Sequence, residues 1–189
     1  MQRLGIPSDE IFLSFHGALD DYEAPTHEYL QHYCNGFPQS LVYYFHCKGV
    51  THPDSPLKER IVRWRMLMEQ FVLMEWRDRV EALLFGNVAC GVNLKGLDDG
   101  VSWRHFSGNF WWARCDHINR LPPPLDLGTP YFKQHSGMKS RRHYAEALIL
   151  DTGFAEWPPV RNCYESHVNH FEVEYVLPNL TALRCTANV

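Results

Sequence analysis

Residues 104–113 read Arg-His-Phe-Ser-Gly-Asn-Phe-Trp-Trp-Ala, and this stretch constrains the fold of the 189-residue chain more than any other. Aromatic and β-prone residues in such a run are typical of a buried strand. The run also carries a glycine and several polar side chains, which makes it more polar than a plain core strand. Two interpretations follow: a core strand, or a segment that carries a binding site.

A second apolar run lies upstream at residues 41–45, Leu-Val-Tyr-Tyr-Phe, and it ends abruptly in His46-Cys47-Lys48-Gly49. An uninterrupted apolar run of this length predicts a strand that is buried on both faces. Ligands of open α/β sheets bind just beyond the carboxyl ends of such strands. The polar residues therefore predict a site where this strand ends.

The rest of the chain alternates strand-like and helical patterns. Further strands are expected at residues 10–15, 87–94, 171–177 and 181–185. Helices are expected at residues 27–34, 57–85, 114–120 and 144–150, with Thr26 capping the first of them. This order predicts one α/β domain over residues 1–189, with a mixed sheet flanked by helices.

Arg65 lies beside the apolar stripe of the expected 57–85 helix. An arginine at that position either covers the edge where helix and sheet pack, or reaches a site at the strand end. Both interpretations of Arg65 stay open at the level of the sequence.

Composition narrows the classes of partner. The net charge is −4 with histidine neutral, so no overall basic field attracts nucleic acid or an anionic membrane surface. The first residues lack the apolar core of a signal peptide, and no apolar run approaches the roughly 20 residues of a membrane span.

The six cysteines are scattered and lack a Cys-x-x-Cys pair, which indicates reduced, buried thiols and a cytoplasmic location.

Acidic and histidine clusters are weak candidates for metal sites. The aspartate pairs at 20–21 and 98–99 fall in turn-rich segments, where solvated side chains are the simpler interpretation. His167 and His170 lie near Glu165 and Glu172, but no cysteine or third histidine follows at the usual ligand spacing. The chain also lacks the glycine-rich motifs of Rossmann and P-loop enzymes and the nucleophile motif of α/β-hydrolases.

Several short motifs occur in a fixed order over residues 22–150. They are Tyr-Phe-His-Cys-Lys-Gly-Val at 44–50, Val-Arg-Trp-Arg at 62–65, Gly-Val-Asn at 91–93, His-Phe-Ser-Gly-Asn-Phe-Trp-Trp-Ala at 105–113, Leu-Pro at 121–122, and Arg142 with Glu146. This series resembles a group of uncharacterised glycosyltransferase-like proteins that are distantly similar to rhamnan synthesis protein F. Two positions depart from the family pattern: Cys47 replaces a threonine, and Leu148 replaces a tryptophan.

The resemblance implies a nucleotide-diphospho-sugar transferase fold of the GT-A kind, which moves a sugar from a nucleotide-sugar donor to a carbohydrate or other hydroxyl acceptor. It implies catalytic roles for His46 and Glu146, with His46 where other such enzymes carry Asp-x-Asp. The residues expected to bind donor or acceptor are Lys48, Gly49, Arg65, His105, Ser107, Gly108, Asn109, Trp111, Trp112 and Arg142.

The chemistry of these side chains suits that expectation. Lys48 and the backbone amides near Gly49 would neutralise a departing diphosphate. Trp111 and Trp112 would offer apolar faces to a sugar ring. Glu146 would accept the proton of the acceptor hydroxyl. A divalent cation, Mn²⁺ or Mg²⁺, would need His46 or a carboxylate from the loops, because no Asp-x-Asp stands there.

Only about 20 residues precede the matched region, fewer than the nucleotide-binding half of a GT-A domain requires. Three hypotheses follow. The chain is an active transferase with an abbreviated or partner-supplied donor half, or a non-catalytic carbohydrate-binding remnant, or an N-terminally truncated fragment of a longer enzyme.

Overall fold

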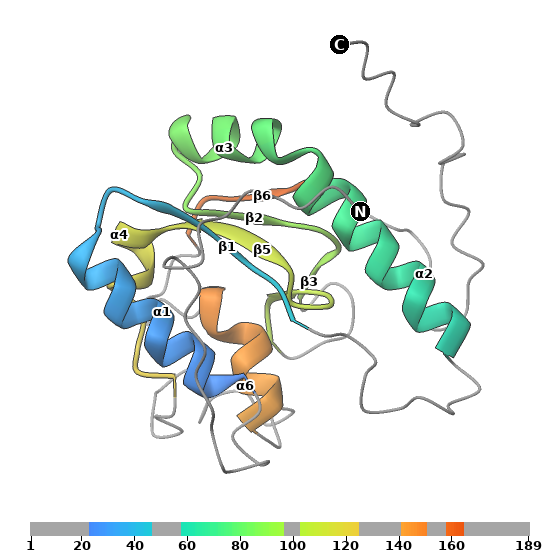
Figure 1. Cartoon of the computed structure of the whole chain (residues 1–189), viewed down its shortest axis with the longest axis horizontal. Helices are drawn as coiled ribbons and strands as arrows, with labels where there is room; N and C mark the ends of the chain where they lie inside the picture. Colours follow the sequence, from blue (N-terminus) through green and yellow to red (C-terminus); the bar gives the residue numbers. More distant parts are fainter. Residues whose placement is uncertain (1–22, 47–57, 97–102, 125–140, 151–157, 165–189) are drawn as a thin grey trace, which may run out of the picture.

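The computed structural model describes residues 23–46, 58–96, 103–124, 141–150 and 158–164 (Figure 1). The helical elements are α1 (Ala24–Gly36), α2 (Lys58–Met68), the π-helix η3 (Glu69–Met74), α3 (Trp76–Leu84), α4 (Cys115–Ile118), α6 (Arg141–Ala147) and the 3₁₀ turn η5 (Leu148–Leu150). The strands are β1 (Leu41–Tyr44), β2 (Ala89–Gly91), β3 (Leu94–Lys95), β4 (His105–Phe106), β5 (Trp111–Arg114) and β6 (Val160–Asn162).

Four of these strands form a mixed sheet in the order β1-β5-β2-β6. Strand β5 runs antiparallel to both of its neighbours, and β2 pairs with β6 in parallel. Strands β3 and β4 form a separate antiparallel pair. The predicted α/β class with a mixed sheet flanked by helices is therefore confirmed.

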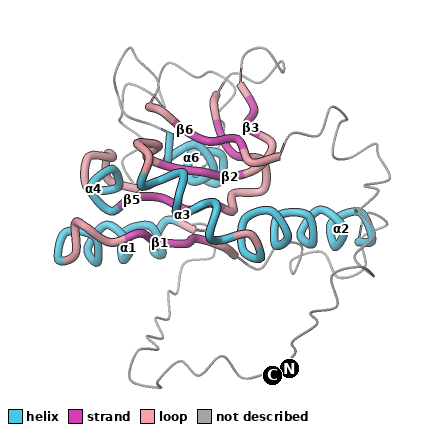
Figure 2. Tube along the Cα trace, turned by 90° about the horizontal axis from the view of Figure 1, so that it is seen from above, coloured by secondary structure: helices cyan, strands magenta, loops and turns pink. Residues whose placement is uncertain are grey.

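Helices cover both faces of the sheet. In Figure 1, α1 and α6 lie on one side of it, and α2 and α3 lie on the other. Seen from above in Figure 2, α2 extends past the ends of the strands. The first residues of α2 are accordingly exposed to solvent.

Trp111 and Trp112 point to opposite faces of the sheet, one toward the helices on each side. Trp111 is opposite Tyr44 in the register and packs in the core on the α1 and α6 side. Trp112 is opposite Tyr43 and packs with the residues of α2 and η3. The interpretation of the aromatic motif as a core strand thus holds for residues 111–114, because alternate side chains of a strand point to opposite faces.

Strand β1 differs from its expectation in burial. It forms at the predicted place, but three of its four residues are only partly buried, and Phe45 beyond it is 62% exposed. Among the described strands, β1 pairs with β5 alone. The apolar run predicted burial on both faces, whereas β1 lies at one edge of the sheet and runs antiparallel to β5.

The single helix expected over residues 57–85 is divided. α2 passes into the π-helix η3, and α3 begins after Glu75, which has φ −92° and ψ 30°. A π-helical turn shifts hydrogen bonding from the fourth to the fifth residue and often marks a site under local constraint. Here the carbonyl oxygen of Val72 accepts a hydrogen bond from Trp112 Nε1 at 2.8 Å. The tertiary contact explains a break that the apolar periodicity did not show.

Other helices and strands also begin or end at residues that differ from the expected ones. α1 begins at Ala24 with Pro25 in its first turn, so Glu23 and not Thr26 occupies the N-cap position. The expected 87–94 strand is divided into β2 and β3, because Asn93 adopts φ +48°. α4 is shorter than expected, and β6 had not been predicted.

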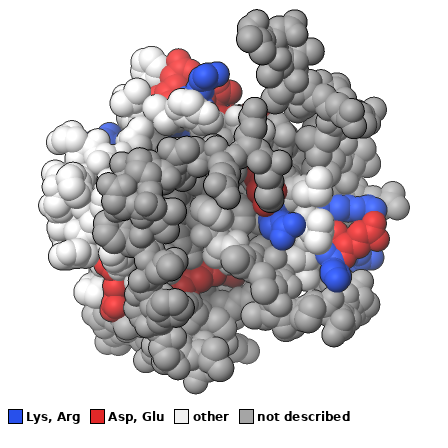
Figure 3. All heavy atoms as spheres, viewed as in Figure 1, with Lys and Arg blue, Asp and Glu red and all other residues white. Residues whose placement is uncertain are grey.

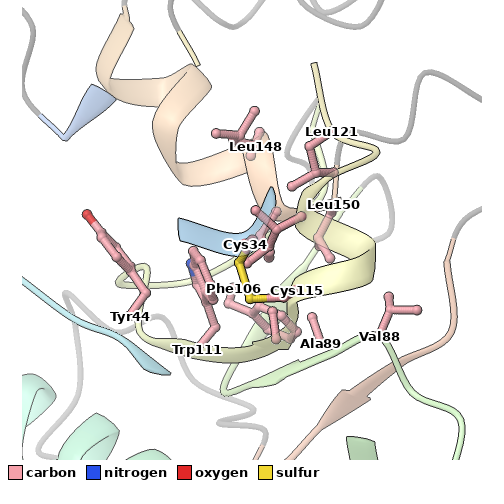
Figure 4. Packing of buried hydrophobic residues seen from close by; sticks show 14 of the residues in the cluster. Cys34, Tyr44, Val88, Ala89, Phe106, Trp111, Cys115, Leu121, Leu148 and Leu150 are labelled. Carbon is pink, nitrogen blue, oxygen red and sulfur yellow. A yellow bond between two sulfur atoms is a disulfide. The ribbon is translucent and has the colours of Figure 1, made fainter. Parts of the chain in front are cut away.

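Cys34 of α1 and Cys115 of α4 form a disulfide across 81 residues of sequence. Figure 4 shows it in the core between the first helix and the sheet. The interpretation of all cysteines as reduced thiols was therefore wrong for this pair. Scattered positions concealed the pairing, because the two cysteines meet only in the folded chain. These two cysteines no longer argue for a reducing compartment.

Several expectations lie outside the described residues. They concern the strands at 10–15, 171–177 and 181–185, the loops with paired aspartates, Lys48, Gly49, and the histidines at 167 and 170. Among the described helices, none combines the length and the apolar character needed to cross a membrane.

Candidate functional site

The two stretches singled out in the sequence meet in the structure. His46 follows β1, and its Nε2 atom lies 3.0 Å from the carbonyl oxygen of Gly108, which belongs to the turn between β4 and β5. The imidazole also contacts the ring of Phe110 edge to face, with centroids 5.5 Å apart. His46, Gly108 and Phe110 thus lie together at the end of β1 and in the β4–β5 turn.

The turn that carries this carbonyl has an unusual backbone. Gly108 has φ +93° and Asn109 has φ +58°. A Cβ atom at Gly108 would lie 2.1 Å from the sulfur of Met68 and 3.0 Å from Trp64 Cζ2. Position 108 therefore requires glycine for two reasons, the left-handed backbone and the close approach of α2.

A carboxylate that the sequence did not single out lies beside His46. Oε1 of Glu23 is 3.5 Å from His46 Nδ1, and Oε2 accepts a hydrogen bond from the Tyr44 hydroxyl at 3.0 Å. The side-chain amide of Asn109 donates to the same Oε2 atom. Glu23 thus connects the start of α1, the end of β1 and the β4–β5 turn.

Glu23 and His46 are shielded but reachable from solvent, since their side chains are 17% and 21% exposed. An imidazole with an acceptor near each nitrogen donates to one of them when neutral and to both when it carries two protons. A carboxylate next to a histidine is the usual arrangement for orienting an acid–base imidazole. The pair can therefore exchange a proton with a bound hydroxyl group.

His27 lies behind this pair, one turn into α1. Its ring packs 4.6 Å from Tyr44 and 6.0 Å from Trp111, centroid to centroid, and it is almost fully buried. Burial, with a smaller contribution from the charge of His46, lowers the pKa of His27 to about 3. His27 is therefore neutral at physiological pH.

Tyr44 is the third member of this layer. Burial raises the pKa of its hydroxyl, and the adjacent Glu23 carboxylate raises it further. The hydroxyl consequently keeps its proton and donates it to Glu23. Figure 4 shows Tyr44 and Trp111 side by side in the core.

Most of the expected sugar-binding wall lies inside the protein. Asn109 is fully buried, where its Oδ1 accepts from Trp111 Nε1 at 2.8 Å, and Ser107 and His105 are buried as well. Trp111 is 1% exposed. In this arrangement these side chains fix the turn and the carboxylate, and they present no open aromatic face to a ligand.

The other expected residues that the structure describes belong to β5, α2 and α6. Trp112 is partly buried and directed toward η3. Arg65 of α2 pairs with Glu69, the first residue of η3, at 3.3 Å. Glu146 is partly buried on α6, next to Ala145, whose carbonyl oxygen lies 3.5 Å from the Asn109 amide. Arg142 belongs to α6 by its backbone.

The charged side chains of α2 are basic except for Glu59, and Figure 3 shows blue and red side chains next to one another at that helix. Arg63 pairs with Glu59 at 2.5 Å, and Arg65 pairs with Glu69. Within the ranges that the structure describes, no three His, Cys, Asp or Glu side chains gather as ligands for a metal. The cluster around His46 therefore supplies no described ligand set for Mn²⁺ or Mg²⁺.

Two hollows border described residues. A cavity of about 10 Å³, lined by His27, Gln31 and Trp111 among others, has room for about one water molecule. A larger cleft of about 510 Å³ lies on the opposite side of the sheet, between α3 and the end of β6.

Comparison with known proteins places the chain in one family. A family model described as a domain of unknown function, DUF8361, matches residues 15–156. Searches of curated proteins and of solved structures give no match. The match spans most of the chain and includes every element from α1 to η5. The chain is therefore a member of the DUF8361 family.

Proposed function

We propose that this protein transfers a sugar from a nucleotide-sugar donor to a hydroxyl acceptor, with His46 and Glu23 as its acid–base pair. The observation that carries the proposal is the shared contact of His46 with Glu23 on one side and with Gly108 on the other. It joins the two motifs on which the resemblance to glycosyltransferase-like proteins rests. We further propose that the sheet belongs to a GT-A-like domain.

The proposed reaction has these steps. The acceptor oxygen attacks the anomeric carbon, the bond from that carbon to the diphosphate breaks, and the nucleoside diphosphate departs with the electron pair. The acceptor proton passes to His46 Nδ1 when Nε2–H donates to Gly108, and the Glu23 carboxylate then stabilises the imidazolium. Glu146, on the adjacent helix α6, is the second candidate base.

In this proposal the buried aromatic motif has a supporting role. Asn109 holds the Glu23 carboxylate, and Trp111 holds Asn109 through its indole N–H. Such supporting hydrogen bonds keep catalytic groups in a productive orientation. The donor diphosphate would be neutralised by Lys48, Gly49 and Arg142, whose side chains or positions lie outside the described part of the structure.

The test is a transfer assay with the purified chain and a panel of nucleoside-diphosphate sugars, with Mn²⁺, with Mg²⁺ and with a chelator. Release of nucleoside diphosphate that depends on an added glycan acceptor supports the proposal. His46→Gln should abolish this release, whereas His32→Gln, at an exposed position of α1, should leave it unchanged.

Two results would contradict the proposal. Glycan binding without donor binding or turnover would favour the alternative of a carbohydrate-binding protein without catalysis. Turnover that is equal in His46→Gln and wild type would remove the acid–base pair from the mechanism. Calorimetric titration with each donor separates a failure to bind from a failure to react.

A further inference from the structure

The cleft between α3 and β6 contains a second group of reactive side chains, remote from His46 in the sheet order. It has a volume of about 510 Å³ and is lined by Arg79, Asn87, Arg161 and Cys163 among others. Figure 1 shows α3 running alongside β2 and β6 at this edge of the sheet. The cleft therefore brings a cysteine together with two cations.

Arg79 is the buried cation of the pair. Its side chain is 7% exposed, and Nη2 contacts Glu75 at 2.5 Å. Its Nε atom has no hydrogen-bond partner within the described structure. A buried guanidinium with an unsatisfied donor favours an anion beside it. Arg79 and Cys163 line the same cleft, and a deprotonated Cys163 is a candidate for that anion.

Cys163 follows β6 directly. Its backbone N–H donates to Gly91 O at 2.8 Å, which holds the residue against β2. The Cys163 sulfur lies 3.7 Å from the carbonyl oxygen of Arg161, and the Cys90 sulfur lies 3.5 Å from the carbonyl oxygen of Arg79. Cys90 is fully buried, whereas Cys163 is partly exposed and borders the cleft. One of the two thiols is thus reachable and the other is not.

We propose that Cys163 is a reactive thiolate held by Arg79 and Cys90, and that it is a site of covalent modification by hydrogen peroxide. The thiolate sulfur attacks one peroxide oxygen, the O–O bond breaks, and hydroxide leaves and is protonated to water. The sulfur is oxidised to a sulfenic acid while the peroxide is reduced.

The electrostatic surroundings agree with this assignment. The hydrogen bond with Cys90, together with the charges of Arg79 and Arg161, lowers the pKa of the Cys163 thiol below its ordinary value despite burial. The same contact raises the pKa of Cys90, so that Cys90 keeps its proton. Asp78 and Glu81 also line the cleft, and their charges oppose the effect of the two arginines.

The experiment compares alkylation of Cys163 by iodoacetamide in the folded chain and in the same chain unfolded in guanidinium chloride. No reductant is added, so the Cys34–Cys115 disulfide stays intact, and peptide mass mapping separates Cys163 from the other thiols. At pH 6 the folded chain should react about fivefold faster, because an ordinary thiol is almost fully protonated there. The advantage should disappear above about pH 9, where both forms are ionised.

Variants of the residues near Cys163 test which of them causes its faster alkylation at pH 6. Arg79→Met should bring the pH 6 ratio close to one, and Arg79→Lys should keep part of it. If Arg79→Met does not fold, Arg161→Met provides the same comparison at an exposed position. Cys90→Ala and Cys90→Ser form a second comparison, because serine keeps a hydrogen-bond donor and alanine does not.

Peroxide treatment followed by dimedone should label Cys163 in the wild type and not in Cys163→Ser. A folded-to-unfolded ratio at or below one at pH 6, or a ratio that does not change with pH, would overturn the proposal. Dimedone labelling confined to other cysteines would overturn it as well.

Discussion

His46 Nε2 and the carbonyl oxygen of Gly108 lie 3.0 Å apart, although 62 residues separate them in the sequence. This contact fixes the end of β1 against the β4–β5 turn. It depends on a left-handed backbone at position 108, and the tight packing of Met68 and Trp64 against that position leaves no room for a side chain. The candidate site and the packing of α2 are therefore coupled through one glycine.

Gly108→Ala should destabilise the protein by about 2–4 kcal/mol, because the added Cβ meets the Met68 sulfur and because alanine disfavours φ +93°. Urea unfolding monitored by tryptophan fluorescence measures the change. Gly36→Ala is the matched control, since a Cβ there meets nothing within 4 Å. Equal stabilities of the two variants would contradict the proposed coupling.

Glu23→Gln should lower the free energy of unfolding by about 1–3 kcal/mol. The new amide group brings two donors to a place where the Tyr44 hydroxyl and the Asn109 amide already donate. Glu28→Gln, at an exposed position on the same helix, should change stability little. A Glu23→Gln protein as stable as Glu28→Gln would mean that the carboxylate does not organise the cluster.

Because the pKa of His27 is low in the folded chain, we expect the protein to lose stability in mild acid. Its folded-state pKa is about 3, below the 6.5 of an exposed histidine, so the unfolded chain binds a proton between these values and the folded chain does not. Stability therefore rises with pH through this window. From this residue alone, the protein should be about 2 kcal/mol less stable at pH 5 than at pH 8.

His27→Phe keeps a ring against Tyr44 and removes the titration, so its stability should depend less on pH between 5 and 7. Denaturant unfolding at several pH values provides the comparison. Burial lowers the pKa of His117 too, so part of the slope should remain. A pH dependence identical to that of the wild type would show that His27 is protonated in the folded state.

Removal of the Cys34–Cys115 disulfide should cost about 3–4 kcal/mol, because the bond closes a long loop in the unfolded chain. The double variant Cys34→Ser, Cys115→Ser tests this by thermal or denaturant unfolding. Intact-mass analysis of the wild type under non-reducing conditions, before and after alkylation, counts the bonded cysteines. Alkylation of Cys34 and Cys115 in the native, unreduced protein would contradict the pairing.

The sequence was most informative where local pattern and tertiary environment agree. The apolar run at residues 41–45 and the aromatic run ending in Trp111 and Trp112 both form strands at or near the predicted places. Their roles were harder to predict, because periodicity does not show which strand lies at an edge. The side chains expected to line a sugar site instead fill the core, since a buried aromatic and a sugar-binding aromatic look alike in sequence.

The part of the site that sequence reasoning missed is Glu23. It stands in an acidic segment before α1, where a solvated loop is the simpler interpretation, and only the fold brings it to Tyr44 and Asn109. Pro25 was an available signal, because proline favours the first helical turn and would have placed the start of the helix close to Glu23, before Thr26. The disulfide and the π-helix likewise depend on contacts between distant residues.

The most direct test of the proposed function is the rate of nucleoside diphosphate release, dependent on a glycan acceptor, in the wild type, His46→Gln and His32→Gln. The proposal predicts turnover in the wild type and in His32→Gln, and a loss of about 10²-fold or more in His46→Gln without loss of fold. Equal rates in all three proteins, or no donor turnover by a folded wild-type chain with any donor and metal, would contradict it.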